Sequence, residues 1–364
     1  MNFAYPIKFD VQVRFDRYGG KKLIHKLTSD IPKGDQPLGS ICEFSGHPRE
    51  FSVISNGEFK EKNINELVVK YKNNIIGDYV YKQFGLQLPV IIKFMDCNIT
   101  LPVALHPTNA QAREMSLEDT GKTEAIYIID SDKGAVFYSG HLLGMNKQLI
   151  DRAADKGKTL DCMKKNYSQK GDLFLIPPQR LHAVGGGNLI CEIQRNSYSV
   201  LPLDWLDWPV DREKRKRDCE KGMKILKLET GDTDKPVPLC LDDGNNQRSF
   251  MCITEFFSIE RMNVKETWKQ PEDRETFHLL TCLEGNAEIL MNDKIETLGA
   301  LETILIPAYS GGYTVRPFPE ALILKTYIPD IMKIMNLLKT GGFSKEEIIN
   351  LGGYGVNNNL KNIN

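Results

Sequence analysis

The stretch that decides the fold is GDLFLIPPQRLH, residues 171–182. It has an acidic residue at a turn, then a short apolar strand, then a proline, and it ends at His182. A related stretch, LETILIP, recurs at residues 301–307. In this second copy Gly312 stands where the first copy has His182. The repeat predicts two related β-domains, of which only the first keeps a histidine at this position.

Outward from this repeat, short apolar segments alternate with Gly, Pro, Asn and Asp along much of the chain. Many short strands separated by turn residues are typical of a β-sandwich or a closed barrel. The expected strands include residues 88–94, 125–129, 173–176, 189–194, 252–259, 287–291 and 303–306. Two further stretches, residues 63–84 and 146–167, have apolar residues at helical spacing and predict helical insertions.

The composition is that of an ordinary globular protein, with 41% hydrophobic and 26% charged residues among 364. Lys and Arg number 47 against 48 Asp and Glu, so no global field favours nucleic acid or an anionic membrane. The N-terminus alternates apolar and polar residues, which is a strand pattern rather than a signal peptide, and we expect a cytoplasmic protein. The eight cysteines form no CxxC pair, which favours reduced core thiols over a zinc knuckle.

The spacing of residues 171–182 resembles the second signature motif of the cupin superfamily, although the usual glycine after the proline is Gln179 here. Cupins are small jelly-roll barrels whose interior can hold a metal. The resemblance implies a mainly β protein with two cupin-type jelly-roll β-barrels and helical insertions.

Three residues upstream of and within this motif have the chemistry of a metal site. Residues two apart on a strand share a face, so Lys122 points the same way as Glu124, and Ala104 the same way as His106. Together with His182 this gives two histidines and one carboxylate, a set that suits Zn²⁺ with an open position for water or substrate. Iron and manganese accept the same set. Each residue alone has an ordinary structural explanation, but the three in cupin order favour a metal.

At a finer level the chain resembles the type I mannose-6-phosphate isomerases, which are zinc-dependent cupin enzymes. The matching segments occur in family order and near family spacing between about residues 39 and 194. They are SGHP (45–48), SVISNG (52–57), KFMD (93–96), LHP (105–107), GKTE (121–124), IP (176–177) followed by HAVG (182–185), and EIQ (192–194). The repeat at residues 301–307 matches the family's second, metal-free cupin.

The resemblance implies an aldose–ketose isomerase of a sugar phosphate, most simply mannose 6-phosphate to fructose 6-phosphate, with one Zn²⁺ in the first barrel held by His106, Glu124 and His182. Such an enzyme moves a proton between C1 and C2 and needs a base, for which Glu192 and Lys122 are the candidates. We expect Lys93 to meet the anionic group of the substrate. Arg195, or alternatively Arg180, would replace a family arginine.

Three departures from the family leave a second interpretation open. The family's additional glutamine ligand is Ala104, its phosphate-holding serine is Pro102, and its catalytic arginine is Pro202. A metal-binding cupin that holds a sugar or sugar phosphate without turnover, or that acts on another substrate, is the alternative. The expected partner is a small sugar phosphate, with no nucleic acid and no membrane; the sequence does not determine the oligomeric state.

The domain organisation follows from a charge run and a turn. The run DREKRKRDCEKGMK, residues 211–224, reads either as a phosphate or nucleic-acid patch or as a solvated helix, and its interleaved acids favour the helix. The turn residues GDTDKPVP that follow predict a boundary near residues 232–235. We therefore expect a metal-binding domain over residues 1–235, a metal-free domain over 236–330, and a helix with a poorly packed tail over 331–364.

Overall fold

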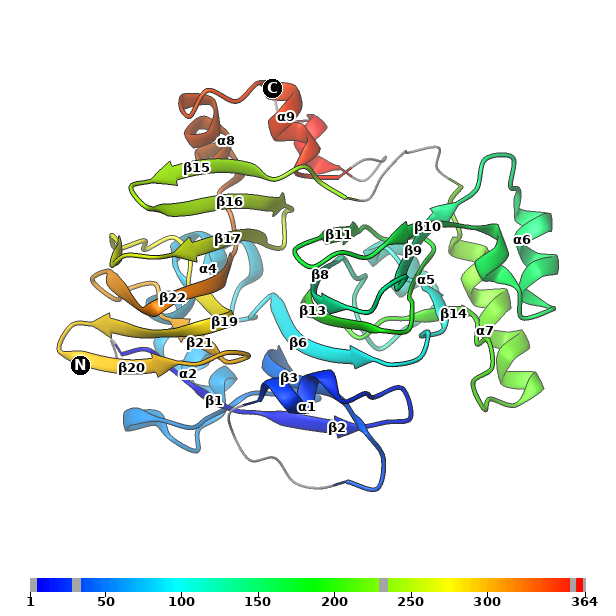
Figure 1. The fold of residues 1–364 in the computed structure, drawn as a ribbon, viewed down its shortest axis with the longest axis horizontal. Coiled ribbons are helices and arrows are strands. Elements are labelled where there is room, and N and C mark those ends of the chain that lie inside the picture. Colours follow the sequence, from blue (N-terminus) through cyan, green and yellow to red (C-terminus); the bar gives the residue numbers. More distant parts are fainter. Residues whose placement is uncertain (1–4, 28–33, 229–234, 354–357, 363–364) are drawn as a thin grey trace.

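The protein is described by a computed structural model that covers residues 5–27, 34–228, 235–353 and 358–362. Two β-barrel units lie side by side, with helices at the outer end of the first unit and, from the C-terminal part of the chain, along one edge of the second (Figure 1). All strand pairs in the part of the chain described are antiparallel. The expected mainly β architecture is therefore confirmed.

The first barrel consists of two facing sheets and a small ribbon. The larger sheet has the order β11-β8-β13-β6-β3-β2, with β4 paired to β3, and the smaller has the order β10-β9-β12-β7-β14. The larger sheet comprises β2 (Gln12–Phe15), β3 (Leu38–His47), β4 (Glu50–Phe51), β6 (Val90–Cys97), β8 (Glu124–Ser131), β11 (Leu173–Ile176) and β13 (Asn188–Arg195). The smaller comprises β7 (Val103–Leu105), β9 (Val136–His141), β10 (Met163–Tyr167), β12 (His182–Val184) and β14 (Leu201–Asp204). The ribbon pairs β1 (Phe9–Asp10) with β5 (Val53–Ile54).

The second barrel is a single eight-stranded sheet with the order β15-β16-β17-β22-β19-β20, to which β18 and β21 add at β22 and β19. Its strands are β15 (Leu239–Asp243), β16 (Asn246–Ile253), β17 (Ser258–Val264), β18 (Trp268–Gln270), β19 (His278–Met291), β20 (Lys294–Leu298), β21 (Thr303–Ile306) and β22 (Tyr313–Tyr327). The two halves of the sequence repeat become β11 and β21, each paired antiparallel to a neighbour in its own barrel. Gly312, at the histidine position of the second copy, has a φ of +89°, which favours glycine.

The helices occupy the insertions and the C-terminal end. They are α1 (Lys22–Lys26), α2 (Ile64–Tyr71), α3 (Asn73–Ile76), α4 (Asp78–Phe84), α5 (Asn109–Glu114), α6 (Lys147–Ala154), α7 (Arg212–Ile225), α8 (Ile331–Thr340) and α9 (Lys345–Asn350), with 3₁₀ turns η1 (Gly57–Phe59), η2 (Thr159–Cys162) and η3 (Asn359–Asn362). The charge run is α7, whose N-cap is Asp211, accepting a hydrogen bond from the Lys214 backbone. No helix in the described ranges is long and apolar enough to span a membrane.

Three local expectations need correction. The helix expected over residues 146–167 ends at Ala154, and its last part is the strand β10, because residues 163–167 pair with β9. The single strand expected over residues 252–259 is split by a turn, in which the Thr254 hydroxyl accepts hydrogen bonds from the backbone of Phe256 and Phe257.

The C-terminal tail is the third correction, because its described residues are well packed. Leu338 of α8, Ile348 of α9 and Leu351 are fully buried, and Leu360 is 1% exposed. They pack with Phe250 and other residues of the second barrel in one apolar cluster. The helical pattern at the start of the tail is confirmed by α8, with Asp330 as its N-cap.

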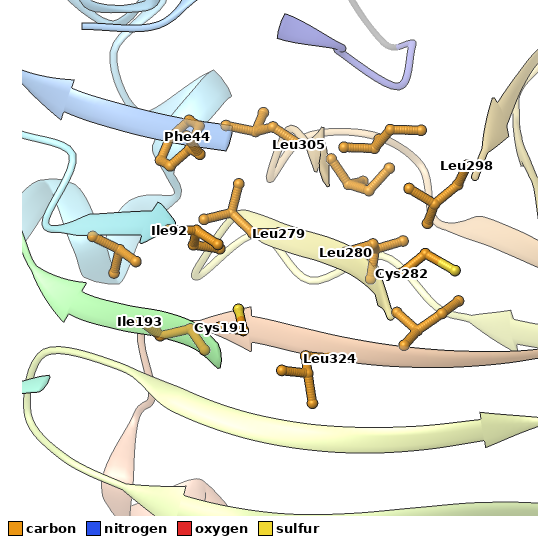
Figure 2. Packing of buried hydrophobic residues seen from close by; sticks show 14 of the residues in the cluster. Phe44, Ile92, Cys191, Ile193, Leu279, Leu280, Cys282, Leu298, Leu305 and Leu324 are labelled. Atoms are coloured by element: carbon orange, nitrogen blue, oxygen red, sulfur yellow. The ribbon is translucent and has the colours of Figure 1, made fainter. Parts of the chain in front are cut away.

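The two barrels share one hydrophobic core. Figure 2 shows Phe44, Ile92 and Ile193 of the first barrel facing Leu279 and other apolar residues of the second. Burial of this continuous apolar surface holds the two units together. All eight cysteines are free, and six of them are buried.

Other contacts join sequence-distant segments across the same interface. Ile7 and Leu305 exchange backbone hydrogen bonds of 2.9 Å in both directions. The N–H of Asp78, at the start of α4, donates to the carbonyl of Arg274.

The boundary expected near residues 232–235 lies largely outside the described residues, so the three-part domain division stays a prediction.

Candidate active site

Three buried ligand groups converge between the two sheets of the first barrel. His106 follows β7, Glu124 begins β8, and His182 begins β12. The Nε2 atoms of His106 and His182 lie 3.2 and 3.1 Å from the same oxygen, Glu124 Oε1. Their ligand atoms all lie within 4.8 Å of one another. The sequence therefore identified three residues that the fold brings to one point.

The hydrogen bonds behind the histidines determine which ring nitrogen faces this point. His106 Nδ1 lies 3.0 Å from the carbonyl oxygen of Ser199, and His182 Nδ1 lies 3.0 Å from that of Arg180. A carbonyl only accepts hydrogen bonds, so each Nδ1 carries the proton and donates it. In the neutral ring, Nε2 then has a free lone pair, and a backbone partner behind the ring is typical of metal-binding histidines.

The electrostatics of the cluster fit a cation. Burial lowers the pKa of His106, which favours the neutral ring. Its Nε2 is buried and makes no hydrogen bond within the described part of the chain, although a carboxylate oxygen is near. Two nitrogen lone pairs and a carboxylate that face one another need a positive charge between them. His106, Glu124 and His182 therefore fit a divalent metal ion.

Lys122 and Glu192 lie beside the three ligands. Lys122 Nζ is 2.7 Å from Glu124 Oε2 and 3.1 Å from Glu192 Oε1. Burial lowers the pKa of Lys122, but the two carboxylates outweigh this effect and raise it above the ordinary value. Burial alone would raise the pKa of Glu124; Lys122 and His106 hold it well below its usual range instead. A proton donor and a carboxylate thus adjoin the His106–Glu124–His182 cluster.

Lys93 completes the cationic lining of this site. It lies opposite Glu192 in the pairing of β6 with β13. Its Nζ is 3.7 Å from Glu50 Oε2 and 4.0 Å from the centre of the Tyr198 ring. Burial lowers the pKa of Lys93, against the opposing effect of Glu192.

All of these side chains line one cavity of about 340 Å³. Its wall also contains Pro102, Ala104 and Pro202, the three positions that depart from the family. Ala104 lies opposite both His182 and Pro202 in the small sheet. The apolar replacements therefore form one side of the cavity, next to a metal ligand.

The structure does not bring Arg195 into this cavity, which corrects the expected role in substrate binding. Glu192 and Gln194 face the cavity from β13, and side chains alternate along a strand, so Arg195 points away. Its guanidinium donates a 2.6 Å hydrogen bond to Asn109 and lies 4.3 Å from the ring centre of Phe256. There it lines a separate cavity of about 420 Å³ that contains residues of both barrels.

Several residues of the cavity were not foreseen. The Tyr198 hydroxyl bonds to Glu50, and Arg14 reaches the mouth of the cavity from β2, 3.7 Å from Glu50 Oε1. Trp205 and Trp208 lie in the same lining. The segment WLDWPV, residues 205–210, was the only signal in the sequence for the tryptophans, since the sequence does not show which loops meet at the mouth of a barrel.

Comparisons with known proteins point to one family of enzymes. Residues 7–136 match the family described as phosphomannose isomerase type I, catalytic domain. The chain is 27% identical over 307 residues to the mannose-6-phosphate isomerase of Streptococcus mutans. The alignment covers 84% of this chain and 93% of the relative. It is 23% identical over 294 residues to a mannose-6-phosphate isomerase of Bacillus subtilis, and this alignment covers 79% of this chain and 89% of the relative.

Solved structures show the same fold. The crystal structure of the mannose 6-phosphate isomerase from Bacillus subtilis aligns with a TM-score of 0.77 at 22% identity, over 88% of this chain and 99% of that one. A variant of the phosphomannose isomerase from Salmonella typhimurium aligns with a TM-score of 0.72 at 13% identity, over 89% and 99%. The partial family match, the relatives at modest identity and the shared fold together support a divergent isomerase of the type I phosphomannose isomerase family.

Proposed function

We propose that this protein is a metal-dependent aldose–ketose isomerase that interconverts mannose 6-phosphate and fructose 6-phosphate, with Zn²⁺ as its metal. One observation carries the proposal: two histidine lone pairs and a carboxylate converge beside the Lys122–Glu192 pair in a single cavity. The names of the relatives support the substrate, and the two-histidine one-carboxylate set suits zinc with an open position.

A metal held by His106, Glu124 and His182 supplies a Lewis acid for the substrate oxygens. The protein's own groups then move the proton between C1 and C2. Glu192 is the better base of the two candidates, because the Lys122 ammonium lies between two carboxylates and stays charged. Lys122 then donates hydrogen bonds to the developing negative charge on the substrate oxygens.

Lys93 is the group that we propose for the substrate phosphate. Its ammonium is nearly buried in the cavity wall, where a charge-assisted hydrogen bond to a phosphate oxygen is strong. Arg14, at the mouth and with a side chain 63% exposed, adds a second positive charge on the entry path of an anion.

The second candidate function is a cupin that binds a metal and a sugar phosphate without turnover, or with another substrate. Pro102, Ala104 and Pro202 favour it, because they leave one wall of the cavity without the polar groups that the resemblance implies.

A coupled spectrophotometric assay of the purified, zinc-loaded protein with mannose 6-phosphate separates the two. Turnover that disappears after removal of the metal by a chelator and returns with Zn²⁺ is expected for the isomerase. Zinc-loaded protein that binds mannose 6-phosphate in a calorimeter but does not convert it would instead favour the second candidate.

A further inference from the structure

The segment after β14 carries two tryptophans into the wall of the metal cavity. Trp205 and Trp208 line the same cavity as the three metal ligands. Both side chains are half-buried, so part of each ring remains accessible. The third tryptophan of the chain, Trp268, lies in β18 of the other barrel and is 5% exposed. Two of the three tryptophans therefore lie in the wall of this one cavity.

Helix α7 holds the backbone of this segment in place. The guanidinium of Arg215 donates hydrogen bonds to the carbonyls of Leu206, at 2.9 Å, and Val210, at 3.0 Å, and to that of Trp208. The N–H of Leu206 donates to Asp204 Oδ1 at 2.8 Å. One planar side chain that binds three carbonyls fixes the path of the whole turn. The charge run seen in the sequence thus has a specific structural partner.

The two indole rings are anchored as well. The indole N–H of Trp205 donates to Asp218 Oδ2 at 2.9 Å, and that of Trp208 donates to the carbonyl of Thr100 at 3.1 Å. Lys214 Nζ lies 4.8 Å from the centre of the Trp205 ring, and the Arg17 guanidinium lies 5.6 Å from that of Trp208. Because both indole N–H groups are bound to protein, the ring carbons are what the two side chains contribute to the cavity wall.

We infer that Trp205 and Trp208 form an aromatic platform that binds the C–H face of a hexose phosphate and determines selectivity for the hexose ring. This inference rests on the proposed function and deepens it. Aromatic faces carry partial negative charge and attract the weakly positive hydrogens of sugar C–H groups. Pro102, Ala104 and Pro202 form an apolar wall in the same cavity. Stacking thus takes over part of the binding that polar groups would otherwise supply.

The fluorescence of the tryptophans tests the platform independently of turnover. In zinc-loaded Trp268→Phe protein only the two cavity tryptophans emit, and we expect mannose 6-phosphate to change their emission saturably, while inorganic phosphate at equal concentration changes it much less. Trp205→Leu and Trp208→Leu should each weaken mannose 6-phosphate binding about three- to tenfold, since an aromatic contact of this kind is worth that much. The corresponding Phe variants should recover most of the affinity.

The outcomes separate this inference from the proposed function. Saturable fluorescence changes without any isomerisation would leave the platform standing and refute the isomerase. Calorimetric binding or turnover of mannose 6-phosphate that is the same in the wild type and in both Leu variants would overturn the platform. A failure of mannose 6-phosphate to bind the zinc-loaded protein would overturn it too.

Arg215 is a positioning residue in this arrangement. Arg215→Ala should raise KM for mannose 6-phosphate with little change in kcat and in zinc content, because only the platform loses its support. Arg217→Ala, on the exposed side of the same helix, is the matched control and should behave as the wild type. Equal KM values in the two variants would show that α7 does not position the platform.

Discussion

The ammonium of Lys122 lies 3.1 Å from Oε1 of Glu192, and both side chains are largely buried, 6% and 12% exposed. A charged donor and a carboxylate at this distance, next to a candidate metal site, have the geometry for moving a proton on a substrate held between them and the metal.

Glu192→Gln tests which of the two is the base. The amide keeps the size of the side chain and can still accept from Lys122, but it cannot take a proton. We expect kcat to fall about 10²- to 10⁴-fold, the range typical of a lost general base, with KM and metal content nearly unchanged. Steady-state kinetics and metal analysis measure both. If kcat stays within a few-fold of the wild type, Glu192 is not the base and Lys122 becomes the candidate.

His182→Ala tests the metal centre. Removing one of three ligands leaves His106 and Glu124, which do not make a closed zinc site. Elemental analysis after dialysis should find about one metal ion per chain in the wild type and almost none in the variant. Zn²⁺ should also raise the melting temperature of the wild type and not of the variant, because a metal that binds only the folded state stabilises it.

His25→Ala is the control for this experiment, since His25 is exposed on α1. It should retain the metal and the thermal shift. Equal metal content in His182→Ala and the wild type would remove His182 from the ligand set.

The convergence of His106, Glu124 and His182 was predictable because their positions follow from local rules. The alternation of side chains along strands put Glu124 with Lys122, and the repeat marked His182 as the histidine that the second barrel lacks. The same rule explains the error at Arg195, which is one residue after Gln194 and so faces the other side of β13.

Other features depended on tertiary contacts that no local pattern contains. Residues 163–167 are polar and Lys-rich, yet they are a strand because β9 offers an edge to pair with. The tail is packed because the second barrel exposes an apolar surface to Leu338 and Ile348. Trp205 and Trp208 line the cavity in a segment whose backbone carbonyls are bound by Arg215. From the sequence, the helix that carries Arg215 was expected only to be exposed to solvent.

A buried carboxylate at the interface of the barrels should make stability depend on pH. Glu43 is buried, and its Oε2 accepts a 3.0 Å hydrogen bond from the backbone of Thr303. Burial, with the nearby Glu302, raises the pKa of Glu43 from 4.5 to about 8. The Glu43 carboxyl group therefore binds its proton more tightly in the folded state than in the unfolded state. The stability that the protonated group contributes is complete below about pH 4.5 and is lost as the pH rises to about 8.

Glu43→Gln removes this ionisation while keeping the side chain's size. Compared with the wild type, the variant should be equally stable at pH 5 and more stable at pH 8, by an amount on the order of a few kcal/mol. Urea unfolding at the two pH values measures the difference. If the wild type were instead more stable than Glu43→Gln at pH 8, the fold would stabilise the charged carboxylate and the expectation would be wrong.

The second barrel contains a buried ionic network that should be sensitive to the loss of one member. Glu260 is 1% exposed; its carboxylate lies 3.2 Å from Lys325 Nζ and 2.8 Å from an Arg248 nitrogen, and it accepts a 2.7 Å hydrogen bond from the Tyr327 hydroxyl. Burial by itself would raise the pKa of Glu260, but Lys325 and Arg248 lower it to about 2. Glu260→Ala leaves the buried Lys325 and the partly buried Arg248 without their anion and should cost about 3–5 kcal/mol of unfolding free energy.

The exposed ion pair of Lys333 with Glu275, 3.1 Å apart, provides the comparison. Its side chains are 62% and 44% exposed, so Lys333→Ala should cost less than about 1 kcal/mol. Chemical denaturation of both variants measures the contrast, and similar losses in the two would show that the buried network adds nothing beyond a surface pair.

The backbone pairing of Ile7 with Leu305 has a consequence for how the protein is made. Ile7 leaves the ribosome long before Leu305, because most of the chain lies between the two residues. The segment around Ile7 must therefore wait without this partner, and the first barrel cannot bury its full share of the common core until the second has formed. Contacts of such large sequence separation slow folding and prolong the lifetime of intermediates that aggregate. Shielding of this N-terminal segment during translation should thus determine how much active protein a cell obtains.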